Sequence, residues 1–507
     1  MSKRKATDLQ TTECTRQTEG RKIAINFGDH DDKGENYLLD EKGDNYFIDY
    51  TRDNYLFKEE DDDDDEDYYF LDDEKGDNYS GEDRISELPD EILIAIVSLL
   101  DIWEGGRTCV ISKRWRFLWA SVTCLNFDDK GWGFSERLRK PCICGLFKIL
   151  QSHQGSTLER LRISHCDLDS ECCRSDVNNS IESAILQKRV QRLEIDDVRF
   201  SNDPYIFPER PFKIPFGFSC MKSLTHLSFN NTNIHCRIVG HFLSHCPLLE
   251  HLCIRSSSEI YVLKVVGPSL RLKFLQISDC PSVVKIEIFA PNLASFIYDG
   301  KGPYRTGIVM KHAPSLVMLS LAETDDCISK AFRSVSSYFS RLQTLSLRIG
   351  LGQRSIMLPE SPELSSLKKL SLTIHMGQNS KILMDLTSLI ERSPFLHRLE
   401  LRLKWSGLFT YCTSSMQKIN KCPHPCLKVV TISGFIGSRM DTKFAMYLIE
   451  NSLVLEKLIF DLQKNYDFLS LKHYLSRKTT KKKIEATRKH ALQIGKQLPP
   501  GAELIVI

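Results

Sequence analysis

The sequence predicts an α/β protein in which three helices precede an irregular, horseshoe-shaped solenoid of parallel strands, behind a disordered acidic N-terminal tail. Three observations predict this order. The pattern Leu-x-x-Leu-x-Leu, with other apolar residues allowed, recurs twelve times between residues 158 and 460. Apolar residues recur at helical spacing in the segment 83–129, and acidic residues are concentrated before it. The chain is therefore predicted to be a repeat array with appended parts.

Length and composition exclude several classes of protein. The 507 residues are 41% hydrophobic, which suffices for a large core and excludes a fully disordered or collagen-like chain. No apolar run approaches the ~18 residues of a membrane span, and the N-terminus lacks the apolar stretch of a secretion signal. The 17 cysteines are scattered, as is typical of reduced thiols. We therefore expect a protein of the nucleus, the cytoplasm or both, with no membrane partner.

The net charge of +2 conceals two parts of opposite sign. Residues 28–83 contain 24 acidic and 5 basic residues, whereas residues 84–507 carry a net charge of +18. Self-repulsion and the entropy of ordering the acidic part are not offset by burial, so we expect residues 1–82 to be disordered. Two interpretations stay open: a solvated extension, or a segment that attracts basic partners or covers the chain's own cationic body.

A compact helical module is predicted at residues 83–129. The sequence LPDE, which begins at Leu88, is typical of a helix start, because proline loses no hydrogen bond there and carboxylates suit the positive helix end. Ser112 is placed to cap a later helix. A module of this size buries only about 60% of its unfolded-chain surface, so we expect it to pack against something else.

The predicted solenoid consists of leucine-rich repeats at residues 130–425. Successive copies of the pattern start 21 to 34 residues apart, and most intervals lie in or near the range of that repeat class. The i, i+3 and i+5 residues should enter a core shared with neighbouring repeats, while the residue between the last two faces outward. The copies start at Leu158, Val190, Leu224, Leu249, Leu272, Leu293, Leu316, Leu342, Leu367, Leu396, Leu427 and Leu455.

Outward strand positions are expected to form the surface that binds a target protein. Basic side chains predominate there, which favours an acidic protein or another anionic ligand, although solvated charge is the commoner explanation. The Pro- and aromatic-rich segment 199–218 is either a binding loop or a simple insertion. The candidate target-binding residues are Arg162, Glu194, His226, His251, Arg255, Arg348, Arg398 and Arg402.

The C-terminal end is predicted to close the array. In residues 426–465 a strand is followed by a turn at Gly434 and Gly437, a helix and a further strand. Such a segment provides the terminal cap that a solenoid needs. Residues 466–507 are predicted to form a basic helix, a turn and a short last strand.

Several of these segments resemble one plant protein family. The module with DRIS, LPDEIL, SKRWR and LNFDD resembles an F-box, and HCPLLEHL, DCPSVVKI and HAPSLVML resemble the repeats of plant F-box proteins. The segment from Cys426, with GFIG and YLIEN, resembles the FBD element that often closes them. The chain thus looks like a plant F-box/leucine-rich-repeat/FBD protein. The resemblance implies a substrate-recognition subunit of an SCF (Skp–cullin–F-box) ubiquitin ligase.

The resemblance also implies which residues contact the Skp-type adaptor and, through it, the cullin core of the ligase. The chain departs from the family pattern at Asp101, where proline is common, and at Gly105-Gly106, where small aliphatic residues are usual. Each interior glycine costs ~0.5–1 kcal/mol relative to alanine, so we expect a frayed or short second helix. The implied adaptor-binding residues are Leu88, Pro89, Ile92, Ile96, Leu99, Val110, Ile111 and Trp115.

No chemistry of its own is predicted for this chain. It lacks the motifs GxGxxG, GxSxG and HExxH, and its one tight Cys/His group, Cys422 to Cys426, has no second ligand pair for zinc. We therefore expect no enzyme activity, catalytic residue, metal or cofactor, and an unknown target protein as partner. Two alternatives remain: a non-ligase scaffold whose acidic tail binds basic nuclear proteins, and a nucleic-acid-binding protein, disfavoured because it lacks a recognised module.

Overall fold

The computed structural model describes two compact units, Met1–Glu87 and Leu88–Ile507. In the first unit three short strands, β1 (Ala24–Ile25), β2 (Tyr37–Leu39) and β3 (Asn45–Phe47), pair antiparallel in that order. The rest of the predicted acidic tail lies outside the described residues. From residue 85 on, the structure describes residues 85, 87–100, 102–108, 111–112, 114–128, 146–153, 155–168, 170–208, 221–300, 306–323, 335–349, 363–376, 387–405, 422–462 and 477–507.

The second unit begins with the helical module, whose three predicted helices are confirmed. They are α1 (Asp90–Val97), α2 (Ile102–Arg107) and α3 (Trp115–Leu118), and the 3-10 turn η2 (Trp119–Ser121) follows. The predicted helix start at LPDE is confirmed, but Pro89 is the N-cap of α1 and Asp90 its first residue, whereas the sequence predicts the proline at the first helical position. The prediction for Ser112 is wrong: its backbone carbonyl accepts from Trp115, but its buried hydroxyl has no hydrogen-bond partner.

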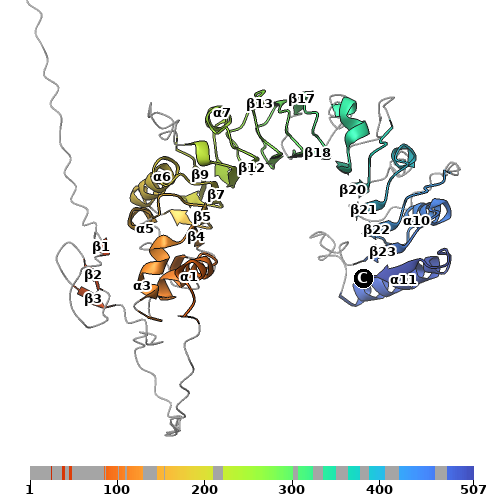
Figure 1. Cartoon of the computed structure of the whole chain (residues 1–507). Helices are drawn as coiled ribbons and strands as arrows, with labels where there is room; N and C mark the ends of the chain where they lie inside the picture. Colours follow the sequence, from red (N-terminus) through yellow and green to blue (C-terminus); the bar gives the residue numbers. More distant parts are fainter. Residues whose placement is uncertain are drawn as a thin grey trace, which may run out of the picture. The chain divides into compact units, whose positions relative to one another are not determined.

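Fourteen parallel strands form one continuous sheet, along which they follow one another on an arc (Figure 1). All twelve predicted strands are present, and the predicted last strand is β24. The first strand, β4, is formed by the end of the predicted helical module. The strands are β4 (Cys124–Asp128), β5 (Arg160–Ser164), β7 (Arg192–Asp196), β10 (His226–Asn230), β12 (His251–Arg255), β14 (Phe274–Ser278), β16 (Ser295–Asp299), β18 (Met318–Glu323), β19 (Thr344–Ile349), β20 (Lys369–Met376), β21 (Arg398–Trp405), β22 (Val429–Ser433), β23 (Lys457–Asp461) and β24 (Glu503–Val506).

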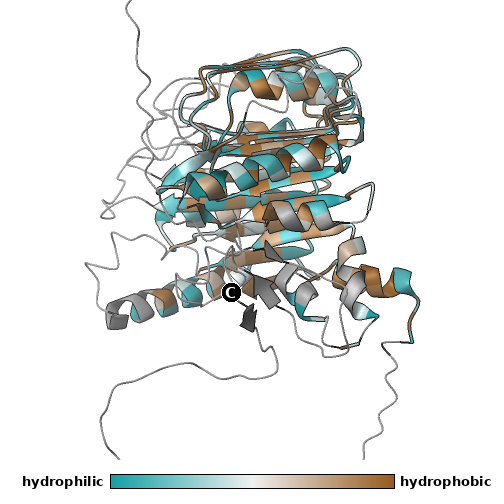
Figure 2. Cartoon of the chain, turned by 90° about the vertical axis from the view of Figure 1, so that its left-hand side faces the viewer, coloured by the Kyte–Doolittle hydropathy of each residue, from teal (hydrophilic) through white to brown (hydrophobic). Residues whose placement is uncertain are grey.

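The sheet keeps one register from strand to strand, because each repeat places its leucines at the same positions. Leu161 pairs with Leu193, Leu193 with Leu227, and Leu227 with Leu252. All of them are buried, and hydrophobic and hydrophilic residues alternate along the strands (Figure 2). The second, fourth and sixth residues of each strand thus build the core, while the first, third and fifth face the other side of the sheet.

Helices and short strands cover the core on its second side, and their distribution follows repeat length in part. The helices are α5 (Leu146–Ser152), α6 (Glu171–Leu186), α7 (Cys236–His245), α10 (Arg439–Asn451), α11 (Arg477–Gly495) and the 3-10 helix η5 (Ser336–Arg341). The strands are β6 (Asp167–Leu168), β8 (Arg199–Phe200), β9 (Asp203–Ile206), β11 (Thr232–Asn233), β13 (Val262–Val266), β15 (Lys285–Phe289) and β17 (Gly307–His312). In the described part of the chain, α6, α7, η5 and α10 lie in repeats of 25 residues or more, whereas the 21–23-residue repeats in the middle have the strands β13, β15 and β17 in this position.

The C-terminal segment caps the array. Gly434 and Gly437 have left-handed backbone conformations, and the side chain of Ser438 then accepts a hydrogen bond from the amide of Asp441 at the start of α10. The carboxylate of Asp441 accepts from the amides of Ile436 and Gly437. The turn and the helix are therefore held together before β23 and β24 extend the sheet. Among the described residues, no helix is long and apolar enough to cross a membrane.

Candidate docking surfaces

Helix α1 has two apolar faces, of which one belongs to the core. Leu93 and Val97 are 0% and 3% exposed and pack inside the module. Ile92 and Ile96 lie at i and i+4 on α1, and Leu99 lies at i+7 in the turn that continues from the helix, where its amide donates to the carbonyl oxygen of Ile96. The three side chains are 48%, 38% and 86% exposed. This set, which we call the apolar stripe, is left open to solvent.

The other implied adaptor-binding residues are divided between surface and core. Ile111 is 49% exposed and Pro89 is exposed, whereas Leu88 is half-buried and packs against the core. Trp115 is buried and belongs to the core of the module itself. Val110 lies outside the described residues. The sequence analysis overlooked Ile85, which is 57% exposed and precedes the Leu88-Pro89 turn.

Arg114 joins the third helix of the module to the start of the first. Its Nε donates to Oδ1 of Asp90 at 2.7 Å, and its second terminal nitrogen donates to the carbonyl oxygen of Leu88, also at 2.7 Å. The contact joins residues 24 to 26 positions apart, so no local sequence pattern reveals it. Arg114 holds in place the turn that carries Leu88 and Pro89.

Gly105 explains one departure from the family pattern. It is buried in α2, and a Cβ atom added there would lie 3.3 Å from Cγ1 of Val97 in α1. The absence of a side chain therefore lets the two helices approach closely. The expected shortening of the second helix is seen, since α2 has six residues. Asp101 lies outside the described residues.

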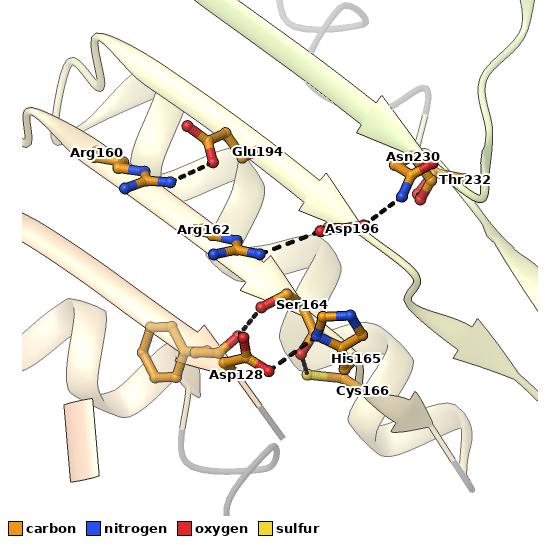
Figure 3. Close-up of polar contacts among 11 residues, drawn as sticks. Asp128, Arg160, Arg162, Ser164, His165, Cys166, Glu194, Asp196, Asn230 and Thr232 are labelled. Carbon is orange, nitrogen blue, oxygen red and sulfur yellow. Dashed lines mark hydrogen bonds and ion pairs between the residues drawn. The ribbon is translucent and has the colours of Figure 1, made fainter. Parts of the chain in front are cut away.

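The outward face of the sheet carries the candidate target-binding residues, and ion pairs link them across strands. At the N-terminal end, Arg160 pairs with Glu194 at 2.6 Å and Arg162 with Asp196 at 3.2 Å, and Asn230 donates to the same aspartate (Figure 3). The strand register brings these charges together diagonally, because Arg160 lies opposite Arg192 and Arg162 lies opposite Glu194. Each arginine therefore reaches the carboxylate at the next outward position of the adjacent strand.

Charges on the later strands are also paired, within one strand, between adjacent strands or across an intervening strand. Arg348 contacts both carboxylate oxygens of Asp299, at 2.8 and 2.7 Å, and Arg398 lies 3.9 Å from Glu400, which also binds Lys369. Arg255 donates to Oε1 of Gln276. Arg402 is exposed on β21. Much of the basic character that the sequence predicts for this face is therefore neutralised within the chain.

His226 and His251 lie in equivalent positions on β10 and β12, and their rings stack. The centroids are 4.2 Å apart with an angle of 11° between the planes, and the ring of Phe274 continues the stack at 5.5 Å from His251. The Thr225 hydroxyl oxygen lies 2.8 Å from Nδ1 of His226 and 3.1 Å from the carbonyl oxygen of Gln191.

Both imidazoles are held in the neutral form. Burial lowers the pKa of His226 to about 4, and the nearby His251 and Arg192 add to this effect. Burial likewise lowers the pKa of His251, against the opposing influence of Glu250. At neutral pH these side chains therefore behave as flat aromatic groups without charge.

The Cys/His group of the sequence has a structural role where the structure describes it. His424 is buried, and its Nε2 lies 3.2 Å from the hydroxyl of Tyr447 on α10. Cys422 donates its amide to the side chain of Asn451. Within the described ranges, no three His, Cys, Asp or Glu side chains are grouped so as to hold a metal ion.

A helical module with an exposed apolar stripe, continuous with a parallel sheet of leucine-rich repeats, defines the class of F-box proteins that carry such repeats. Comparison with family models gives the same result. The F-box domain model matches residues 85–127, and the model for the LRR domain of At1g61320/AtMIF1 matches residues 209–504. The chain belongs to the F-box/leucine-rich-repeat family.

Relatives from Arabidopsis thaliana have names that include the terms F-box, FBD or LRR-repeat. The putative FBD-associated F-box protein At5g56440 is 26% identical over 419 residues, 74% of this chain and 92% of the relative. The F-box/LRR-repeat protein At3g26922 is 27% identical over 286 residues, 52% of this chain and 90% of the relative. The F-box/FBD/LRR-repeat protein At3g26920 is 26% identical over 295 residues, 54% and 65% of the two chains. Proteins of this class are typically adaptors rather than enzymes.

Proposed function

We propose that the chain is the substrate-recognition subunit of an SCF-type ubiquitin ligase. Its F-box would bind a Skp-type adaptor, and its repeat sheet would bind the protein to be ubiquitinated. The observation that carries this proposal is the apolar stripe of Ile92, Ile96 and Leu99, which the described part of the chain leaves uncovered.

The energetic argument concerns apolar area that the fold leaves in water. Burying an isoleucine or leucine side chain contributes roughly 1.5–3 kcal/mol. The module places Ile92 and Ile96 next to each other on α1 and Leu99 just after it, and Ile111 is also exposed. A contiguous apolar surface of this kind is typical of an interaction site. An adaptor helix that covers it would recover this free energy.

The assembly would act by bringing the target protein close to the ubiquitin-transferring subunits. The adaptor connects the chain to the cullin core, while the sheet holds the target in the same complex. Tethering then raises the effective concentration of target lysines near the transferase that other subunits recruit. The chain needs no catalytic group for this role.

We also propose the nucleus, the cytoplasm or both as the site of action. The ten cysteines in the described part of the chain are all free thiols. Free thiols suit the reducing conditions of these compartments.

Substitution of one stripe residue tests the adaptor interaction. Ile92→Asp in the full chain should lower retention of a recombinant plant Skp-type adaptor at least about tenfold, because it places a carboxylate in the apolar contact. Ile206→Asp is the matched control, since this isoleucine is 64% exposed on β9. The control should bind like the wild type, and both variants should keep the wild-type circular dichroism spectrum.

Failure of the wild-type chain to retain the adaptor would overturn the ligase role and favour the scaffold alternative. Equal retention by the Ile92→Asp variant and the wild type would show that the stripe is not the docking surface.

A further inference from the structure

The outward face of the sheet is not uniform in charge. On the strands near both ends, ion pairs involve the first and third residues. The first and third residues of six central strands carry no charge once the histidines are neutral, and the ion pair between Arg348 and Asp299 joins fifth residues of these strands. We call the first and third residues of these six strands the uncharged stripe. Its members are His226, Ser228, His251, Cys253, Phe274, Gln276, Ser295, Ile297, Met318, Ser320, Thr344 and Ser346. All are partly exposed. A charged group of a partner would find no counter-ion among them.

A column of stacked rings runs along this stripe and then stops. The rings of His226, His251 and Phe274 follow one another at the spacing of the strands. The next residue in the same position is Ser295, which pairs in register with Phe274 and has no ring. Among the described residues, no further ring contacts Phe274 on the side of β16. One face of the Phe274 ring is therefore without an aromatic neighbour.

Met318 stands on the far side of this interruption. It pairs in register with Ser295, whose hydroxyl lies 3.2 Å from its sulfur. Two strand spacings separate β14 from β18, about 9.6 Å. A ring placed midway would lie about 4.8 Å from Phe274 on one side and from Met318 on the other. This distance is within the range of aromatic stacking and of sulfur–aromatic contacts. The unbranched thioether of Met318 can change rotamer to admit it.

We propose that the uncharged stripe captures an aromatic side chain of the target protein, which stacks on Phe274 above Ser295 and against Met318. This inference rests on the proposed function, since it names the class of target segment that the sheet would bind. The segment carries an exposed Phe, Tyr or Trp and no charge at the contact. It differs from the acidic target that the basic composition of the body favours.

Two properties of the stripe favour an aromatic side chain over other groups. The stack already present defines the plane in which another ring fits, and the neutral imidazoles present ring faces rather than a charge. Aromatic side chains also dominate the binding energy of protein interfaces because they bury a large rigid area at low entropic cost. An acidic side chain would lose its hydration without gaining an ion pair.

The test is a substitution that places a phenyl ring of the protein itself at the proposed binding position. Ser295→Phe adds a phenyl group where the target ring is expected, and Ser371→Phe on β20 is the matched control, an equally outward serine outside the stripe. The probe is N-acetyl-tryptophanamide, observed by saturation-transfer NMR with the full-length proteins. A library of random peptides, panned on the same proteins, provides a second measurement.

We expect the wild type and Ser371→Phe to bind the probe and to select peptides rich in Trp, Tyr or Phe. The Ser295→Phe variant should reduce both signals by about tenfold, of the order that loss of an aromatic pair produces. Selection of acidic peptides without aromatic residues, or unchanged binding by Ser295→Phe, would overturn the proposal.

Adaptor binding separates this proposal from the ligase role. Ser295→Phe should retain the Skp-type adaptor like the wild type, because Ser295 is on β16 and the apolar stripe is at α1. Loss of the probe with the adaptor retained supports the aromatic contact. A wild type that binds the probe but not the adaptor would refute the ligase role and leave the aromatic contact standing.

Discussion

His226 and His251 derive their chemistry from the register of the sheet. Neither residue is close to the other in sequence, but the pairing of β10 with β12 stacks their rings. Partial burial, the second imidazole and Arg192 all disfavour a proton on His226, whereas Glu194 and Glu250 favour one. The sequence analysis identified both histidines as outward residues, but their neutral state depends on these neighbours.

The low pKa of His226 predicts how stability changes with pH. Its value falls from an ordinary 6.5 to about 4 in the folded chain. Above pH 6.5 the ring is neutral in both states, so it has no effect on stability. Between pH 6.5 and 4 the unfolded chain binds a proton that the folded chain does not, so stability decreases as the pH falls through this window.

Replacement of His226 by glutamine should reduce this acid sensitivity. Between about pH 7.5 and 4.5 the unfolding midpoint of the wild type should fall further than that of His226→Gln, because the variant cannot bind the proton. Urea denaturation at both pH values measures the difference, and NMR of the ring protons measures the pKa. The prediction would be contradicted if the unfolding midpoint fell equally in both proteins on acidification, or if His226 titrated near pH 6.5.

Other residue-scale features were not predictable, because they join positions far apart in the chain. Arg114 reaches back to Leu88 and Asp90, and Arg162 reaches Asp196 in the next repeat. Sequence spacing shows which face of an element such a residue occupies. It does not show which opposite charge lies beside it, because strand register and helix packing decide that.

At the scale of helices, the glycines of α2 and α7 differ in the space that a side chain would have. Gly105 faces Val97 across the helix contact, whereas a Cβ atom on Gly240 would have no neighbour within 4 Å. Alanine is favoured over glycine inside a helix by about 1 kcal/mol. Only at Gly105 does crowding oppose this preference, since Val97 is β-branched and has little rotamer freedom in a helix.

The two alanine variants should therefore differ in the sign of their effect. Gly240→Ala should raise the free energy of unfolding by roughly 0.5–1 kcal/mol, and Gly105→Ala should lower it. Thermal denaturation of the full chain, followed by circular dichroism, makes the comparison. If Gly105→Ala stabilised the chain as much as Gly240→Ala, the side chain of Val97 would be able to move away from the added methyl group at no cost in free energy.

The Pro- and aromatic-rich segment 199–218 has two interpretations from its sequence, a binding loop or a simple insertion. Its composition fits a binding loop, and it remains partly outside the described residues. In its described first half, Tyr205 and Phe207 are buried, and the ring of Phe207 lies 5.1 Å from Phe229 and 5.9 Å from Phe242. This half packs under the neighbouring repeat, so the interpretation as a simple insertion fits it better.

At the scale of the whole molecule, the F-box and the repeats share a strand. The end of the F-box forms β4, which pairs in register with β5 and buries Leu125 and Phe127. The module that is too small to be stable alone thus receives its support from the sheet. In turn, β5 is paired on both sides, because β4 takes its place as the edge strand.

Removal of this shared strand should damage the repeats next to it. A chain that begins at residue 130 loses the burial of Leu125 and Phe127, about 3–6 kcal/mol, and exposes the edge of β5. A chain that begins at residue 122 keeps β4. Hydrogen exchange of the β5 amides should be much faster in the shorter chain, and that chain should aggregate more readily. Equal protection of β5 in both chains would contradict this role of β4.

The sequence alone determined the order of the parts and the register of the twelve predicted strands. Leucines at i, i+3 and i+5 can all be buried only if neighbouring repeats stack in one register. A local sequence pattern therefore suffices to predict that register. Only the tertiary structure decided that the F-box contributes the first strand, that several of the basic outward residues are paired with carboxylates, and that an apolar stripe stays exposed at α1. These properties depend on side chains brought together from different repeats and helices, and such proximity is not encoded in any single repeat.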